Sequence, residues 1–170
     1  MSRGNLIEFQ ERLAMRLKEA QHAEAESRWL AVLAGGEHIL LPLAQAGEIS
    51  SVEALTPLPH ARDWFAGLVN LRGVLCGVID LGQFLGATRS SRAPTQARLV
   101  QFSPRLDINA ALLVDQLAGL RTPAQFVLDP HAPPPSSPWL GPGLRDATGQ
   151  AWRELDLATL VDDPRFLQVV

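Results

Sequence analysis

The sequence predicts a mostly β chain preceded by one long helix, and three observations lead to this fold class. From Arg28 onward, short runs rich in Val, Ile and Leu are separated by turn-forming pairs such as Gly35-Gly36, which is the pattern of strands joined by turns. Residues 5–26 contain neither Gly nor Pro, as expected of a helix. Residues 130–142 are dense in proline, which excludes regular helix and central strand and predicts a long loop.

The predicted helix carries a narrow apolar stripe. Its members are Leu6, Phe9, Leu13 and Leu17, which recur at spacings of three and four residues. An isolated helix of this kind is marginally stable, so we expect it to dock, either on the β-domain of its own chain or of a neighbour, or in the groove of a partner. Residues 1–27 are therefore predicted to form a helical extension ahead of a domain that spans residues 28–170.

Two hairpins are predicted at the start of that domain. The first joins the runs 29–33 and 38–43 through the glycine pair at 35 and 36. The second lies within residues 67–86, where apolar runs flank Arg72-Gly73 and a single helical turn follows. Asp80 is placed to cap this turn, with Gln83 three residues later.

The rest of the domain is predicted to continue as strands and loops. Residues 87–97 are small and polar, so we expect a surface loop and a boundary between two lobes there. Further strands are predicted at 98–102, 108–114 and 151–155, each an apolar run bounded by turn residues. A last helical turn is predicted at 157–161 and is expected to end before Pro164.

The composition limits the class of protein. A chain of 170 residues can bury roughly 70% of its unfolded surface, so it needs neither a metal nor a disulfide to fold. The net charge of −3 argues against a nucleic-acid partner, which favours a basic face. There is no apolar run long enough to cross a membrane, we expect no signal peptide, and the single cysteine excludes an intramolecular disulfide. The cytoplasm is the expected location.

The sequence shows no recognisable catalytic or metal-binding pattern. The four histidines share no ligand spacing, and no phosphate-binding loop or nucleophile motif is present. Asp80 and Asp115 each follow an apolar strand, where a cap or turn role is expected. A small hydrolase or transferase would need one of these carboxylates beside a histidine, and Cys76 as a nucleophile would need the same. We therefore expect no enzyme activity, no cofactor and no metal.

Arg72 is the unusual residue of the second hairpin, because a guanidinium between two apolar strands cannot stay unpaired in a core. One interpretation is a structural arginine that holds backbone carbonyls across the bend. The other is an arginine at the rim of a partner-binding groove, since arginine is enriched where interfaces gain most of their energy. The two roles are compatible.

The same hairpin resembles the CheW family of chemotaxis coupling proteins. The similar residues are Gly67, then Asn70-Leu71-Arg72-Gly73, then Ile79-Asp80-Leu81, although Gly77 stands where the family usually has proline. Residues 46–49 resemble the family's V-x-E-I run, with Ala46 in the first place, and residues 114–117 resemble its V-D-x-V run. The segments 144–157 and 163–167 resemble the PilI-type members, which serve the chemosensory system controlling type IV pili.

This resemblance implies a fold and a function. The fold would be two packed, five-stranded, SH3-like β-barrels. The function would be a non-catalytic adaptor in the cytoplasm, recruited to receptor arrays at the membrane without inserting into it, which couples the signalling tip of a methyl-accepting chemoreceptor to the regulatory domain of a chemotaxis histidine kinase. The residues implied to bind partners are Ala46, Glu48, Gly67, Asn70, Arg72 and Leu117. The alternative is a β-barrel module that binds a ligand or nucleic acid, which favours interleaved basic and aromatic residues.

Overall fold

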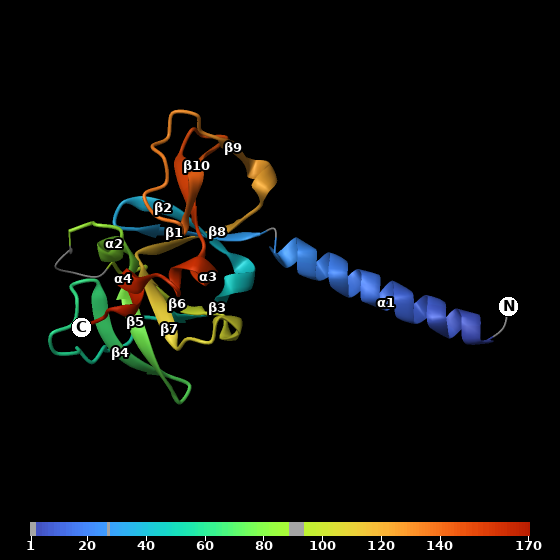
Figure 1. Cartoon of the computed structure of the whole chain (residues 1–170), viewed down its shortest axis with the longest axis horizontal. Coiled ribbons are helices and arrows are strands. Elements are labelled where there is room, and N and C mark those ends of the chain that lie inside the picture. Colours follow the sequence, from blue (N-terminus) through green and yellow to red (C-terminus); the bar gives the residue numbers. More distant parts are fainter. Residues whose placement is uncertain (1–2, 27, 89–93) are drawn as a thin grey trace.

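The computed structural model describes residues 3–26, 28–88 and 94–170. In this part of the chain, eleven strands form two sheets, short helices join them, and one long helix stands at the N-terminus (Figure 1). The prediction of a mostly β chain with an N-terminal helix is confirmed.

One sheet has six strands in the spatial order β8-β1-β2-β11-β10-β9. Its members are β1 (Trp29–Ala34), β2 (Glu37–Pro42), β8 (Gln116–Arg121), β9 (Phe126–Leu128), β10 (Leu140–Asp146) and β11 (Ala151–Leu155). The strands at the two ends of this order, β8 and β9, are separated in the chain only by Thr122 and the 3-10 helix η3 (Pro123–Gln125). The sheet must therefore curl, and Phe126 of β9 packs edge-on against Trp29 of β1, with ring centroids 5.5 Å apart.

The other sheet has five strands in the order β3-β6-β7-β5-β4. Its members are β3 (Ala46–Ser51), β4 (Phe65–Leu71), β5 (Val74–Asp80), β6 (Arg98–Phe102) and β7 (Ala110–Val114). The segment after edge strand β3 reaches edge strand β4, where the Thr56 amide donates to the Leu68 carbonyl at 2.8 Å. This sheet therefore also curls toward closure. The strands divide as six and five, where the family resemblance implied five and five, and β9 is only three residues long.

The chain crosses between the sheets twice. It leaves the six-stranded sheet after β2 and returns to it at β8, so that residues 46–114 supply the whole five-stranded sheet. The predicted lobe boundary near residues 87–97 is therefore wrong, because the strands on either side of that loop, β5 and β6, belong to one sheet. Residues 89–93 of this predicted loop lie outside the described residues.

Short helices occupy several of the connections. They are α2 (Leu81–Phe84), α3 (Leu157–Leu160), α4 (Pro164–Leu167), η1 (Leu43–Gln45) and η2 (Pro104–Leu106). Asp80 caps α2 as predicted, because its carboxylate accepts from the Gln83 amide at 3.1 Å. Pro164 does not end a helix but begins α4, with Asp163 as the cap. Proline suits this first helical position, whose N–H has no partner in the helix.

A shared core joins the two sheets. It combines residues of both sheets and of the short helices, among them Leu30, Val32, Ile79, Leu112, Phe84 and Phe166. Two smaller clusters lie inside the curled sheets, one around Trp152 and one around Val78. Neighbouring residues along a strand supply different clusters, because strand side chains alternate in direction. Each sheet therefore contributes one face to the shared core. Their central strands also bury apolar side chains on the other face.

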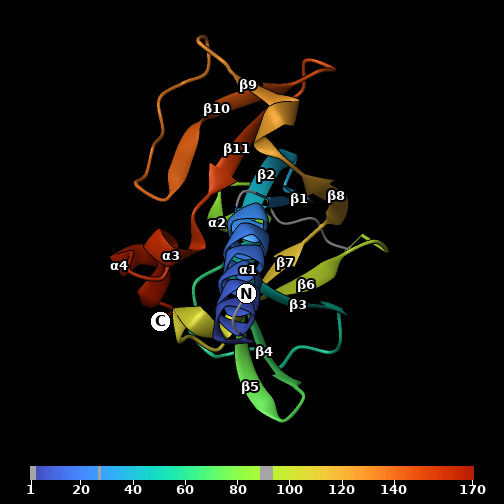
Figure 2. The same ribbon diagram turned by 90° about the vertical axis from the view of Figure 1, so that its right-hand side faces the viewer.

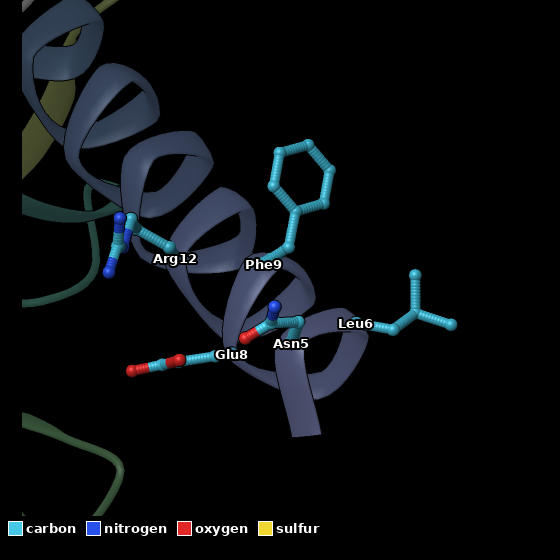
Figure 3. Close-up of a pocket in the computed structure, with 5 residues that line it drawn as sticks. All are labelled: Asn5, Leu6, Glu8, Phe9 and Arg12. Carbon is cyan, nitrogen blue, oxygen red and sulfur yellow. The ribbon is translucent and has the colours of Figure 1, made fainter. Parts of the chain in front are cut away.

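The long helix α1 (Arg3–Glu26) leaves this body beside η1 and extends away from it (Figures 1 and 2). The described side chains from residue 4 to residue 21 are all exposed. Figure 3 shows Leu6 and Phe9 on one side of the helix, and Glu8 and Arg12 on the other. The expectation that the stripe packs on the β-domain of its own chain is wrong, while docking on a neighbour or a partner stays a prediction.

Candidate functional site

The tip of the β4–β5 hairpin (residues 70–75) has a defined and unusual backbone. Arg72 and Gly73 form the two-residue turn, and both have positive φ, +52° and +83°. This combination belongs to the type I′ turn, whose twist matches that of the flanking strands. The side chain of Asn70 supports the turn, because its Oδ1 accepts a hydrogen bond from the Gly73 amide at 2.8 Å. The hairpin predicted from the sequence is confirmed.

Arg72 projects from this turn into solvent and meets the opposite edge of the sheet. Its Nη2 lies 2.8 Å from Oε1 of Glu48 on β3, and the two side chains are 81% and 41% exposed. The interpretation of Arg72 as a structural arginine that holds backbone carbonyls across the bend is therefore wrong. An exposed pair of this kind contributes only about 0–1 kcal/mol to folding, so both charges are available to a partner at little cost.

The other residues implied to bind partners have different surroundings. Gly67 is buried on β4 at φ +141°, and a Cβ there would come within 2.7 Å of the Thr56 carbonyl oxygen. Its role is to allow the close approach that curls the sheet. Ala46 and Leu117 are partly buried against the shared core, and Leu117 stands on the six-stranded sheet. The structure thus brings Glu48, Asn70 and Arg72 together, while Gly67 shapes the backbone behind them.

Two apolar residues of the hairpin tip were missed by the sequence analysis. Val74 and Leu75 are 44% and 61% exposed, although they begin a run that reads as a buried strand. Leu75 is paired with Asn70 across the hairpin, on the opposite face from buried Leu71 and Cys76. In the sequence, only the position of these two residues next to the turn could have indicated that they are exposed. The tip therefore offers one charge pair and two exposed apolar side chains, Val74 and Leu75, which lie on opposite faces of the hairpin.

The two carboxylates and the thiol that were considered for catalysis have structural roles or are buried. Asp80 caps α2, and Asp115 accepts a hydrogen bond from the Gly35 amide at 2.8 Å, which ties β7 to the β1–β2 turn. Burial raises the pKa of the Cys76 thiol, which keeps it protonated and unreactive. The amide of Gly77 donates to the Asn109 carbonyl at 3.0 Å, a bond that the proline usual in the family could not make.

A surface hollow of about 470 Å³ lies over β10 and β11, away from the hairpin tip. Both arginines that line it are engaged: Arg145 pairs with Asp129 at 2.9 Å, and Arg153 donates to the Gly141 carbonyl at 3.0 Å. Across the described residues, no group of three His, Cys, Asp or Glu side chains could hold a metal ion. None of the helices described here has the length and apolar character to cross a membrane.

Comparisons with known proteins agree with this architecture. The model of the CheW-like domain family matches residues 28–165. The protein PilI of Pseudomonas aeruginosa is 33% identical over 110 residues, which cover 65% of this chain and 61% of the relative's own length. The crystal structure of the scaffolding protein TtCheW from Thermoanaerobacter tengcongensis superimposes with a TM-score of 0.60 over 76% of this chain and 88% of that one, at 16% identity.

The structural match supports the fold, and the family model covers both sheets and the whole hairpin tip. The long helix α1 lies outside the matched residues. From residue 28 to residue 165, this chain belongs to the CheW-like domain family.

Proposed function

We propose that this protein is a non-catalytic adaptor that couples a chemoreceptor signalling tip to the regulatory domain of a chemotaxis histidine kinase. The similarity to PilI supports a place in the chemosensory system that controls type IV pili and twitching motility. Its place in the cell would be the cytoplasm, at receptor arrays to which its partners recruit it. No step of this function requires a cofactor.

The observation that carries the proposal is the hairpin tip. Arg72 stands 81% exposed beside Glu48, and exposed Val74 and Leu75 lie within three residues of it. Protein interfaces combine such apolar contacts with arginine anchors, whose removal typically costs about 2 kcal/mol or more of binding. We assign this tip to the receptor, because Glu48 and Arg72, two of the residues that the family resemblance implies to bind partners, meet there.

An adaptor needs a second surface for its second partner. The six-stranded sheet exposes Leu120 on β8 and Val127 and Leu128 on β9, which are 56%, 67% and 68% accessible. They lie on the sheet that does not contain the hairpin tip, so both surfaces can be occupied at once. A partner that covers these side chains would remove their apolar surface from water. We assign this surface to the kinase.

Separate pull-downs against a receptor tip fragment and a kinase regulatory domain test both assignments. Arg72→Ala should weaken receptor binding at least tenfold and leave kinase binding unchanged. Val127→Asp should do the reverse, because it puts an unpaired charge into an apolar contact. Thermal unfolding of both variants checks that each fold is intact, and Arg62→Ala, a change of an exposed arginine away from the tip, serves as the matched control.

Several outcomes would contradict the proposal. An Arg72→Ala protein that unfolds, or that binds the receptor normally, makes Arg72 structural or irrelevant. Failure of the unaltered protein to bind either partner removes the adaptor function. Salt-sensitive binding of an oligonucleotide would favour the alternative of a nucleic-acid module.

A further inference from the structure

The turn at the hairpin tip places an arginine where its backbone is strained. Arg72 has a φ of +52°, and only His60 and Asp107 share a positive φ among the described residues other than glycine. The first turn position of a type I′ hairpin normally holds Asn, Asp or Gly, because a Cβ in the left-handed region crowds the backbone. Arginine at this position therefore strains the backbone locally, and its exposed side chain adds no packing in the core that would offset this strain.

Asn70 supplies the interaction that holds this turn. Its Oδ1 accepts a hydrogen bond from the Gly73 amide at 2.8 Å, so this side chain bridges the strained residue from the end of β4 to the second residue of the turn. With the turn closed, the guanidinium of Arg72 reaches Glu48 on the other edge of the sheet. The chain between Asn70 and Gly73 contains Arg72 itself, so a loosened turn changes the direction of this side chain.

We propose that Asn70 is a positioning residue: it holds the left-handed turn that aims Arg72 across the sheet edge toward Glu48, and it acts on the partner only through Arg72. The part of this inference that concerns binding rests on the proposed receptor function. The part that concerns the geometry of the turn does not.

Nuclear magnetic resonance of the free protein tests the geometry. In the unaltered protein, the Gly73 amide should show the low temperature coefficient of a hydrogen-bonded group, and the Arg72 Nη–H signals should be shifted from those of a free arginine, because Nη2 contacts Glu48. Asn70→Ala should abolish both signatures, and Asn70→Asp should restore the Gly73 signature because a carboxylate oxygen can accept the same bond. Asn109→Ala, at another exposed asparagine, is the matched control. Unchanged Gly73 and Arg72 signals in Asn70→Ala would overturn the proposal.

A double-mutant cycle on receptor binding tests the route of action. Asn70→Ala alone should weaken binding about five- to tenfold, and in the Arg72→Ala background it should change binding by less than about twofold. An equal loss in both backgrounds would show that Asn70 contacts the partner itself, and would overturn the proposal. If Arg72→Ala has no effect on binding, the proposed receptor site fails, whereas the magnetic resonance result still decides the role of Asn70 in the turn.

Discussion

The long helix and the β body contain the same kinds of apolar residue in opposite surroundings. Leu13 and Phe9 of α1 are 50% and 64% exposed, while Leu81 and Phe84 of the shared core are fully buried. The difference comes from geometry, because the two sheets each present an apolar face that the other covers, and nothing in the described body covers the stripe of α1. It follows that the stability of the body should not depend on the helix. The helix itself would be stabilised by packing against a partner.

The largest expected effect is in the shared core. Phe84 packs against Trp64 and Trp139, with ring centroids 5.1 and 5.4 Å away, and no part of it is accessible. Phe84→Ala should lower the free energy of unfolding by about 3–5 kcal/mol because it leaves a cavity between the sheets. Leu13→Ala in α1 should stay within about 0.5 kcal/mol of the unaltered protein. Urea unfolding of both variants measures the contrast, and equal losses would refute it.

A smaller effect is expected at the β10–β11 turn. Asp146 accepts hydrogen bonds from the Thr148 hydroxyl, the Trp152 indole and two backbone amides, and the Thr148 bond leads in lowering its pKa to about 2. A carboxylate whose pKa is lowered by folding stabilises the protein above its unfolded pKa, near 3.8, and this stabilisation is lost as the pH falls toward 2.

The titration of this carboxylate can be isolated by substitution. Asp146→Asn should be less stable at pH 7 and should lose less stability than the unaltered protein between pH 4 and pH 2. Thermal unfolding at a series of pH values measures the two slopes, with Asp162→Asn, at an exposed aspartate, as the control. Parallel slopes for Asp146→Asn and the unaltered protein would argue against a role for Asp146 in acid sensitivity.

The smallest effect is expected on removing the helix. Deletion of residues 1–26 should leave the melting temperature of the body unchanged, because the described side chains of α1 are exposed. Hydrogen exchange of the full-length protein at low concentration should show α1 amides exchanging within seconds, while those of the central strands stay protected. A lower melting temperature after deletion, together with protected α1 amides, would show that the helix packs on its own chain in solution.

Much of the fold could be predicted where apolar runs are bounded by turn residues. Both early hairpins and strands β6, β7 and β11 were predicted within about two residues. Strands β8 and β9 were missed because they carry exposed apolar residues, which hides the alternation of a half-buried strand, and β9 is only three residues long. β10 was partly hidden by Pro142, which lies where the pairing register shifts between Leu140 and Gly143, a place in a sheet that tolerates proline.

Less of the candidate site than of the fold could be predicted from the sequence. The pairing of Glu48 with Arg72 joins two sheet edges, and no local pattern predicts which strands a curled sheet brings together. Both residues were named through the family resemblance, which did not state their contact. Gly67 was named for partner binding, but its positive φ and its closeness to Thr56 are visible only in three dimensions. The prediction of a lobe boundary at residues 87–97 was wrong for a related reason, because the composition of a loop does not show which sheets it connects.

The two crossings between the sheets also bear on how the chain folds. Residues 46–114 form the five-stranded sheet from one continuous segment, whereas the six-stranded sheet joins residues 29–42 to residues 116–155. Closing that long loop carries a larger entropic cost, and strands that pair across it form slowly. On the ribosome, the five-stranded sheet can assemble while the partners of β1 and β2 are still being made. Both edges of the first hairpin must therefore stay unpaired until β8 and β11 emerge.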